Sequence, residues 1–600
     1  MDSPAQAARV ESHVGSSSAP VWLLRYLYNT NPFYLISAAL VMGGLHVLFY
    51  DRAAAAHLQA LTLNSWLLLG VLSGYALLLA VTGCVIVRFG RVWDDARTIL
   101  LTIVILFVAM SVSFDKLVLT NSATLPQVMF AGLVFAVVVT ETLLGILKIR
   151  LPVLFRGPFH LTLGLFFLYP VLLAHLLDHV GDSAAQRGFE WTLWGILLFP
   201  TAAAGITLLL LPAVWSGPRH VAHNGTPWRW PMFPWSLFAV LGVAVVLRSY
   251  WLSISFHPYP GTKSAFGVHF LVPFLLAVSV VVFELGRSAG RKWVQTISLA
   301  APHLLLVVAF PGEGYSKVYG QFLDLFMDRF GSPVVMTWWG LLGLHAYAWL
   351  RGSRHGESGL VAMLVLGSVL GADTMDLRSL RFPAIEPLLA ATVLLVVKAI
   401  WQPAQSVRWF LAWSAAIGTL TVVLWDTPFV AFAGAVPLHL ELVAVLMLGL
   451  VFRDNFARVL QELGAAGLVL ASAIGLIASQ KFSGVPGEFF NGYLVVLSVM
   501  AWGNWFALRG RIQFVAAGIV TGCWLGYAGL LVAAAARRIK NPTGVWLMLA
   551  GTLSFLMAVV ISGAKGGMWS RLRKFSGAAP DTSGNGTVRG IASRGPWLTD

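Results

Sequence analysis

The chain has 600 residues, of which 58% are hydrophobic and only 11% are charged. A soluble globular protein carries about 25% charged residues, so this chain has too few charges to cover a surface that faces water. The composition therefore excludes a soluble enzyme, a disordered chain, a fibrous protein and a nucleic-acid-binding domain, and it predicts an integral membrane protein.

The net charge of +15 does not indicate a nucleic-acid partner. Lys and Arg lie mainly between apolar segments, where they set the orientation of a membrane protein. Cys84 and Cys523 both fall inside apolar segments, with no CxxC or Cys/His spacing, so cysteine-bound zinc and thiol chemistry have no support. The sequence identifies no cofactor.

A transmembrane helix needs about 20 apolar residues. About eighteen segments approach that length, near 33–50, 64–88, 98–113, 127–147, 158–177, 190–215, 233–251, 268–286, 293–310, 332–350, 359–372, 384–400, 408–425, 436–452, 459–479, 490–508, 512–535 and 544–563. We therefore predict an all-α polytopic bundle of about 16–18 spans over residues 33–563. No connection is long enough for a soluble domain.

The two ends of the chain are polar. Residues 1–32 and 564–600 are rich in small and polar side chains, and we expect both to be largely disordered tails. The first apolar run begins about 30 residues in and lacks a convincing cleavage site, so we expect it to remain as a helix and not to be removed as a signal peptide.

Basic residues are unequally divided between the two sets of loops. Loops after even-numbered segments hold 19 Lys and Arg against five Asp and Glu, whereas loops after odd-numbered segments hold 13 of each. The positive-inside rule then places both termini in the cytoplasm, in the cytoplasmic membrane if the source is bacterial. Arg537, Arg538 and Lys540 oppose this, so either segment 512–535 is re-entrant or a weak segment elsewhere does not cross.

Glu141 is the deepest carboxylate, within the apolar segment 127–147. A charge in hydrocarbon costs at least about 2.5–3.5 kcal/mol, so it needs a partner or a function. One interpretation is a hydrogen-bonded residue that fixes helix packing, against Thr140 or Thr142. The other is a relay for a proton or a cation. Both require Glu141 to face the bundle and not the lipid.

Several histidines lie in apolar surroundings. His160, His303 and His345 stand alone along the chain, and we interpret them first as packing residues. His439 and Glu441 are two positions apart, which places them on nearly opposite faces of a helix. The sequence therefore does not predict a pair between His439 and Glu441.

The outer end of segment 158–177 carries His175, Asp178, His179 and Asp182. Spacings of three, four and seven place all four on one helical face. Imidazole and carboxylate groups hold divalent cations or act as acid–base pairs, so His175, His179 and Asp182 are weak metal candidates and Asp178 is a catalytic candidate. The alternative is a solvated helix end.

The connection after segment 293–310 has helical periodicity over residues 318–330. Its apolar and acidic stripes predict an amphipathic helix in the outer interface. This helix is either a connector seated on the membrane or a lid over a cavity, with Glu313, Asp324 and Asp328 facing a substrate. Asp324 and Asp328 are also catalytic candidates.

Four other residues lie at the predicted outer surface. Asp51, directly after the first segment, is a catalytic candidate. Arg378 and Arg381 are suited to binding a phosphate or a carboxylate. Arg248, near the end of its segment, is expected to extend its side chain outward to the interface.

Three functions fit these patterns. Many spans, short loops and 58 glycines favour a secondary transporter or flippase for a small polar or lipid-linked molecule. Acidic outer loops favour a membrane-embedded transferase that uses a lipid-linked donor. A non-catalytic assembly subunit is the third possibility. Transport ranks first, and the lipid bilayer is the one partner that all three share.

The most specific expectation joins two of these regions. We predict that His175–Asp182 and the 318–330 helix form one polar site at the outer surface, because both carry an acidic stripe at the same membrane level. Carboxylates of Asp178 or Asp182 should then approach Asp324, Asp328 or Arg378 within about 10 Å.

Overall fold

A computed structural model gives the structure of the chain. It describes residues 33–53, 58–90, 93–115, 125–178, 185–217, 230, 232–256, 266–310, 317–371, 373–374, 380–481, 487–536, 551 and 554. Within these ranges nearly every residue is helical and no strand occurs. The predicted tails, 1–32 and 564–600, lie outside the described residues.

The helices follow one another through short connections. In chain order they are α2 (Phe33–Ala53), α3 (Leu58–Val85), η3 (Ile86–Gly90), α4 (Trp93–Ser113), α6 (Leu125–Ile146), α7 (Val153–Asp178), α8 (Ala185–Leu208), α9 (Leu211–Trp215), α11 (Trp235–Ser255), η5 (Val268–Leu271), α12 (Val272–Ser288), α13 (Lys292–Ala300), η6 (Ala301–His303), α14 (Leu304–Val308), α15 (Lys317–Phe330), α16 (Pro333–Leu350), α17 (Arg354–Val369), α18 (Ile385–Trp401), α19 (Ser406–Trp425), η8 (Val430–Phe432), α20 (Ala435–Val451), α21 (Asn455–Lys481), α22 (Gly487–Leu508) and α23 (Arg511–Ala536).

Ten stretches of the described chain are long and apolar enough to cross a membrane, which fits an integral, multi-pass membrane protein. They are Ser65–Gly90, Asp95–Ser113, Pro126–Ile146, Val153–His175, Trp191–Trp215, Trp235–Ser255, Val268–Ser288, Ser406–Trp425, Asn455–Ser479 and Arg511–Ala534. The all-helical prediction is confirmed, but the larger number of spans is not. Several predicted segments form helices that are short or interrupted, such as α13–η6–α14, and segment 544–563 lies almost wholly outside the described residues.

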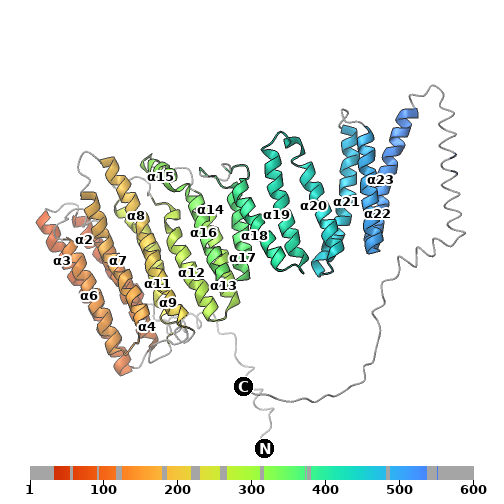
Figure 1. Cartoon of the computed structure of the whole chain (residues 1–600). Coiled ribbons are helices and arrows are strands. Elements are labelled where there is room, and N and C mark those ends of the chain that lie inside the picture. Colours follow the sequence, from red (N-terminus) through yellow and green to blue (C-terminus); the bar gives the residue numbers. More distant parts are fainter. Residues whose placement is uncertain are drawn as a thin grey trace, which may run out of the picture. The chain divides into compact units, whose positions relative to one another are not determined.

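The chain divides into two compact units, Met1–Pro383 and Ala384–Asp600, called here the N-terminal and C-terminal units. In the N-terminal unit, α3 packs against α4, α6 against α7, α7 against α8 and α16 against α17, and α12 packs against α8, α13 and α16 (Figure 1). The short α9 and the helix α15 lie at opposite ends of this unit.

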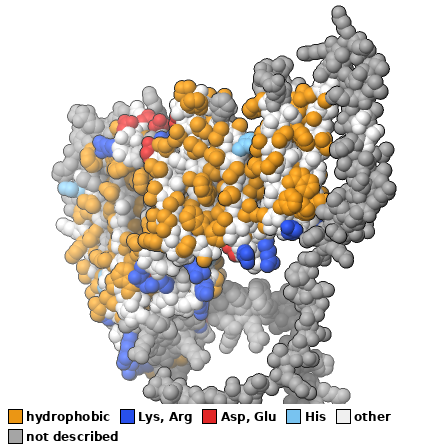
Figure 2. Space-filling view, turned by 45° about the vertical axis from the view of Figure 1, so that its right-hand side comes forward, with side chains coloured by type: hydrophobic (Ala, Val, Ile, Leu, Met, Phe, Trp, Pro, Cys, Tyr) orange, Lys and Arg blue, Asp and Glu red, His pale blue; other side chains and the backbone are white. Residues whose placement is uncertain are grey.

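The interior of the N-terminal unit is rich in aromatic side chains, and its outside is hydrophobic too. Phe107, Phe155, Phe166 and Phe199 are fully buried. Large apolar side chains also cover the outer faces of the helices, and Figure 2 shows a wide hydrophobic band on the visible face. A surface of this kind suits lipid and not water.

The hairpin of α16 and α17 is packed so closely that glycine is required at the contact. A Cβ at Gly356 would lie 2.5 Å from the backbone nitrogen of Trp349, and a Cβ at Gly367 would lie 2.2 Å from the Trp338 ring. The Trp338 indole Nε1 donates to the carbonyl oxygen of Met363 at 2.6 Å. The backbone of α17 therefore lies directly against both the backbone and the side chains of α16, with no room for a larger residue at these two positions.

The amphipathic helix predicted over 318–330 is present as α15, from Lys317 to Phe330. Tyr319, Phe322 and Phe326 are buried, and Phe322 and Phe326 meet the ring of Trp194 on α8 at centroid distances of 5.1 and 6.0 Å. The apolar face of α15 is thus fixed to the bundle by aromatic contacts.

In the C-terminal unit, α18 packs against α19, α19 against α20, and α20 against α21. The helices α21, α22 and α23 contact one another pairwise. Their shared core contains Leu468, Leu497, Ala517 and Val520. Small residues among these allow the helix axes to approach closely.

Candidate functional site

Two candidate spans, α6 and α7, bring Glu141 and His160 together. The Glu141 carboxylate oxygen Oε1 lies 2.7 Å from His160 Nε2 and 3.5 Å from Arg156 Nε. The side chains of Glu141 and His160 remain 36% and 25% exposed, so they are accessible within an otherwise apolar pair of helices. Glu141 therefore has polar partners on α7. The sequence suggests Thr140 or Thr142 as its partners instead, and both lie on the same helix as Glu141.

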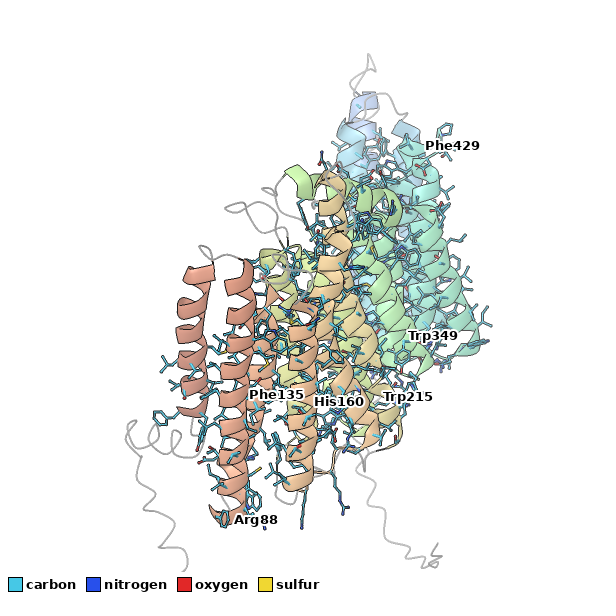
Figure 3. All side chains as sticks on the ribbon, turned by 90° about the vertical axis from the view of Figure 1, so that its left-hand side faces the viewer. Arg88, Phe135, His160, Trp215, Trp349 and Phe429 are labelled. Atoms are coloured by element: carbon cyan, nitrogen blue, oxygen red, sulfur yellow. The ribbon has the colours of Figure 1, made fainter. Side chains whose placement is uncertain are left out.

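Arg156 and His160 lie in the first turns of α7, on either side of a proline. Pro158 lies inside this helix and has no backbone N–H, so one hydrogen bond of the helical ladder is lost next to His160. Arg156 and His160 are four residues apart and share the face toward α6. Figure 3 shows Arg88 near one end of the N-terminal unit and His160 farther in.

The chemistry of this site depends on which atoms carry protons. With Glu141 ionised, His160 donates from Nε2 to the carboxylate. The other ring nitrogen, Nδ1, is buried and has no hydrogen-bond partner in the described part of the chain. The pair can therefore hold a proton on the carboxylate, or an additional proton on the ring.

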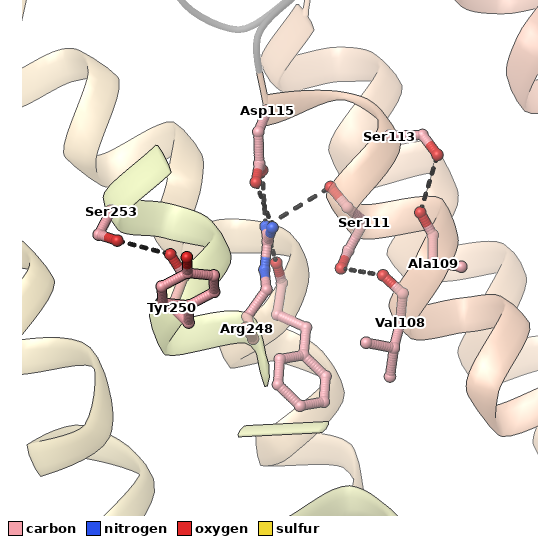
Figure 4. Close-up of polar contacts among 9 residues, drawn as sticks. Val108, Ala109, Ser111, Ser113, Asp115, Arg248, Tyr250 and Ser253 are labelled. Carbon is pink, nitrogen blue, oxygen red and sulfur yellow. Dashed lines mark hydrogen bonds and ion pairs between the residues drawn. The ribbon is translucent and has the colours of Figure 1, made fainter. Parts of the chain in front are cut away.

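A second polar contact involves Asp115, which follows the C-terminal end of α4. Arg248 on α11 is fully buried and forms a two-pronged ion pair with Asp115, in which Nη2 donates to Oδ1 at 2.6 Å and Nη1 donates to Oδ2 (Figure 4). The same Nη2 lies 3.5 and 3.4 Å from the carbonyl oxygens of Ser111 and Phe166. The prediction that Arg248 extends outward is wrong, because a buried carboxylate satisfies it within the bundle.

A third contact joins α12 to the end of α16. Glu284 is 1% exposed and accepts hydrogen bonds from Tyr347, Arg351 and Arg287, at 2.9, 2.7 and 3.1 Å. The Arg351 guanidinium also lies over the Trp215 ring, 5.7 Å from its centre. This cluster closes one end of the helix pair with charge-assisted hydrogen bonds.

The histidines predicted to stand alone are paired. His303 Nε2 lies 3.2 Å from His345 Nε2, which joins the helix break at η6 to α16. His439 and Glu441 are not a pair, as predicted: His439 contacts the Tyr493 hydroxyl at 2.9 Å, and Glu441 accepts from Ser414 at 2.7 Å.

The acidic residues proposed for the outer surface are only partly described. Asp324 and Asp328 are exposed on α15, on the face opposite Phe322, so they point away from the bundle that α15 covers. That α15 acts as a lid whose carboxylates face a substrate stays a prediction. His175 and Arg381 are exposed at the end of α7 and in the connection before α18.

The remaining candidates lie outside the described residues. These are His179, Asp182, Glu313, Arg378 and the side chains of Asp51 and Asp178. The predicted approach of Asp178 or Asp182 to α15 therefore stays a prediction. Among the described residues, no group of three or more His, Cys, Asp and Glu side chains is arranged to hold a metal ion.

Sequence reasoning missed the pairs, although it noted most of their members. Asp115 and Arg248 are 133 residues apart, and His303 and His345 are 42 apart. A polar residue in an apolar helix is a signal that a partner exists. Its position along the chain does not identify that partner.

No protein-family model, no curated protein and no solved structure matches the chain. What the residues themselves establish is a helical protein, with apolar helices that fit a membrane and with polar side chains paired between them.

Proposed function

We propose that the chain is a secondary transporter for a small polar or lipid-linked molecule, and that Glu141 and His160 exchange the proton that drives it. The observation that carries this proposal is the 2.7 Å contact between the two side chains, from two candidate spans. Ionisable residues inside transmembrane helices are expensive to insert and commonly mark ion pathways.

The geometry suits proton exchange in two respects. Carboxylate and imidazole are within direct transfer distance, so a proton moves along one hydrogen bond without water. Both side chains remain partly exposed, which leaves a route for a proton to arrive. Arg156 Nε lies 3.5 Å from the Glu141 carboxylate, so a cation stands beside the pair.

The test is a proton-flux measurement with the full chain in liposomes. The vesicles contain a fluorescent pH indicator and the small-molecule fraction of a cell extract, which serves as a substrate pool. An inward proton gradient is then imposed. We expect wild-type vesicles to take up protons only when the extract is present, and Glu141→Gln and His160→Gln each to reduce the rate by about 100-fold.

The matched control is Glu462→Gln, which makes the same chemical change at an exposed carboxylate on α21. It should retain the wild-type rate. Unchanged flux in Glu141→Gln and His160→Gln would remove the proton role from this pair. No extract-dependent flux in the wild type would remove proton-coupled transport.

One observation supports the transferase as a second candidate. Asp324 and Asp328 are four residues apart and exposed on α15, whose aromatic face fixes it to the bundle. Such a helix would hold two carboxylates rigidly at a membrane surface. A radiolabelled polyprenyl-phosphate sugar, incubated with the purified protein, tests this. Transfer that is lost in Asp324→Asn and Asp328→Asn supports the enzyme, and no transfer by the wild type rejects it.

A further inference from the structure

His303 and His345 place their Nε2 atoms within hydrogen-bond distance of each other. The two Nε2 atoms are 3.2 Å apart, and the ring centres are 5.0 Å apart. His345 is buried within α16, and His303 ends the short 3₁₀ turn η6 between α13 and α14. Pro302 in that turn has no N–H, so the helical ladder is broken where His303 lies.

The hydrogen bond of His303 fixes its tautomer. His303 Nδ1 lies 3.0 Å from the carbonyl oxygen of Ala300. A carbonyl only accepts, so Nδ1 is the protonated nitrogen and Nε2 carries a lone pair. That lone pair is directed at His345. A histidine with Nδ1 bound to a backbone carbonyl and Nε2 free is the form that metal ions bind in proteins.

His345 can present a second lone pair in exchange for one hydrogen bond, the one between the two rings. Its Nδ1 is buried and has no partner in the described part of the chain, whether or not it is protonated. Moving the ring proton from Nε2 to Nδ1 breaks no contact at Nδ1, but it gives up the hydrogen bond between the rings. Both Nε2 atoms then carry lone pairs, and a bound cation would take the place of that hydrogen bond.

The separation of these nitrogens matches a metal chelate. Zn–N bonds are about 2.0–2.1 Å, so two nitrogens at the tetrahedral angle around one ion lie about 3.3 Å apart. The 3.2 Å between His303 and His345 agrees with that value.

A glycine on the neighbouring helix sets the position of the His345 ring. A Cβ at Gly359 on α17 would lie 2.1 Å from His345 Nδ1, so only glycine leaves room for the ring in this place. Gly343, on α16 itself, has open space around its Cβ position. Gly359 therefore determines where the His345 ring lies, and Gly343 does not.

We propose that His303 and His345 bind a divalent transition-metal ion, of the class of Zn²⁺ and Cu²⁺, through their two Nε2 atoms. Water or a bound anion supplies the remaining ligands, since borderline ions of this class accept imidazole nitrogen together with oxygen. The site lies in α13–η6–α14 and α16, away from Glu141, and does not depend on the proposed transport.

The test uses the purified full chain, with an affinity tag that contains no histidine. Calorimetric titration with Zn²⁺ should show one site whose affinity falls by at least about 100-fold in His303→Gln and in His345→Gln. The electron paramagnetic resonance spectrum with one equivalent of Cu²⁺ should show coupling to two nitrogens in the wild type.

Control variants keep the result independent of folding. Gly359→Ala retains both histidines but displaces one ring, and should weaken Zn²⁺ by about tenfold. Gly343→Ala and His439→Gln should leave the affinity unchanged. All variants must show wild-type circular dichroism. Wild-type affinity in either His303→Gln or His345→Gln would overturn the chelate, as would a copper spectrum without coupling to two nitrogens.

Discussion

The two units of the chain connect their helices with different chemistry. In the N-terminal unit, charged pairs join helices, as in Asp115 with Arg248 and Glu284 with Arg351. In the C-terminal unit, neutral groups take a larger part. There Thr392 meets Thr419 at 3.0 Å, Trp502 donates to Thr521 at 3.0 Å, and Trp524 donates to Asn491 at 3.0 Å.

This difference has an energetic consequence. A buried ion pair contributes little net stability compared with apolar side chains of the same volume, but the loss of one partner leaves an uncompensated buried charge. A hydrogen bond between membrane helices averages only about 0.6 kcal/mol, because the separated helices find other partners. The N-terminal unit should therefore be sensitive to single polar substitutions, and the C-terminal unit tolerant of them.

The largest expected effect comes from breaking the Asp115–Arg248 pair. Arg248→Met leaves the Asp115 carboxylate buried without its cation, and should lower the free energy of unfolding by about 3–5 kcal/mol. Denaturation by sodium dodecyl sulfate in mixed micelles, followed by circular dichroism, measures it.

The double variant Asp115→Leu with Arg248→Met sharpens this test. Since no charge remains in the interior, most of the lost stability should return. A double variant as unstable as Arg248→Met would mean that the pair matters for shape and not for charge.

A smaller effect is expected in the C-terminal unit. Ser414→Ala removes the hydroxyl that donates to Glu441 at 2.7 Å. The free energy of unfolding should fall by about 0.6 kcal/mol, and by no more than about 1.7 kcal/mol. The same micelle titration measures it. A loss near that of Arg248→Met would contradict the contrast between the units.

The smallest effect concerns pH. The Ser406 hydroxyl donates to Asp454 at 2.6 Å, and the backbone N–H groups of Ala457 and Ser406 donate at 2.8 and 3.0 Å. These bonds, led by the hydroxyl, lower the pKa of Asp454 below its ordinary value. Their stabilisation is complete above the pKa of the unfolded chain and is lost as pH falls through the lowered folded value.

Asp454→Asn should therefore reduce the acid sensitivity of unfolding below about pH 4. Near neutral pH, the variant should lower the melting temperature by about 2 °C, since the carboxylate is solvent-accessible and its bonds are screened. Thermal unfolding between pH 3 and pH 7 measures both changes. Parallel pH profiles for wild type and variant would exclude a stabilising role for these hydrogen bonds.

The helices were largely predictable because hydrophobicity is a local property. Segment 127–147 becomes α6, and the stripes over 318–330 become α15 with its apolar face buried. The number of spans was not predictable in the same way. Segment 293–310 is predicted as one span, but Pro302 interrupts it, so it forms two short helices and a turn.

The polar pairs were not predictable, because they depend on which helices become neighbours. Arg248 is near the end of its segment, which suits both an outward extension and a buried pair. The structure places Asp115 beside it, and this excludes the first arrangement. The sequence identifies Glu141 as the deepest carboxylate. It does not identify His160 as the partner, because that contact depends on how α6 packs on α7.

The tight hairpin of α16 and α17 also defines a pattern by which distant relatives can be recognised. Gly356, Gly359 and Gly367 meet Trp349, His345 and the Trp338 ring, and each contact excludes a Cβ. Val365, on the other side of α17, is exposed and free to change. A divergent sequence that keeps this hairpin should therefore retain glycine, two residues, glycine, seven residues, glycine, after most of its other side chains have been replaced.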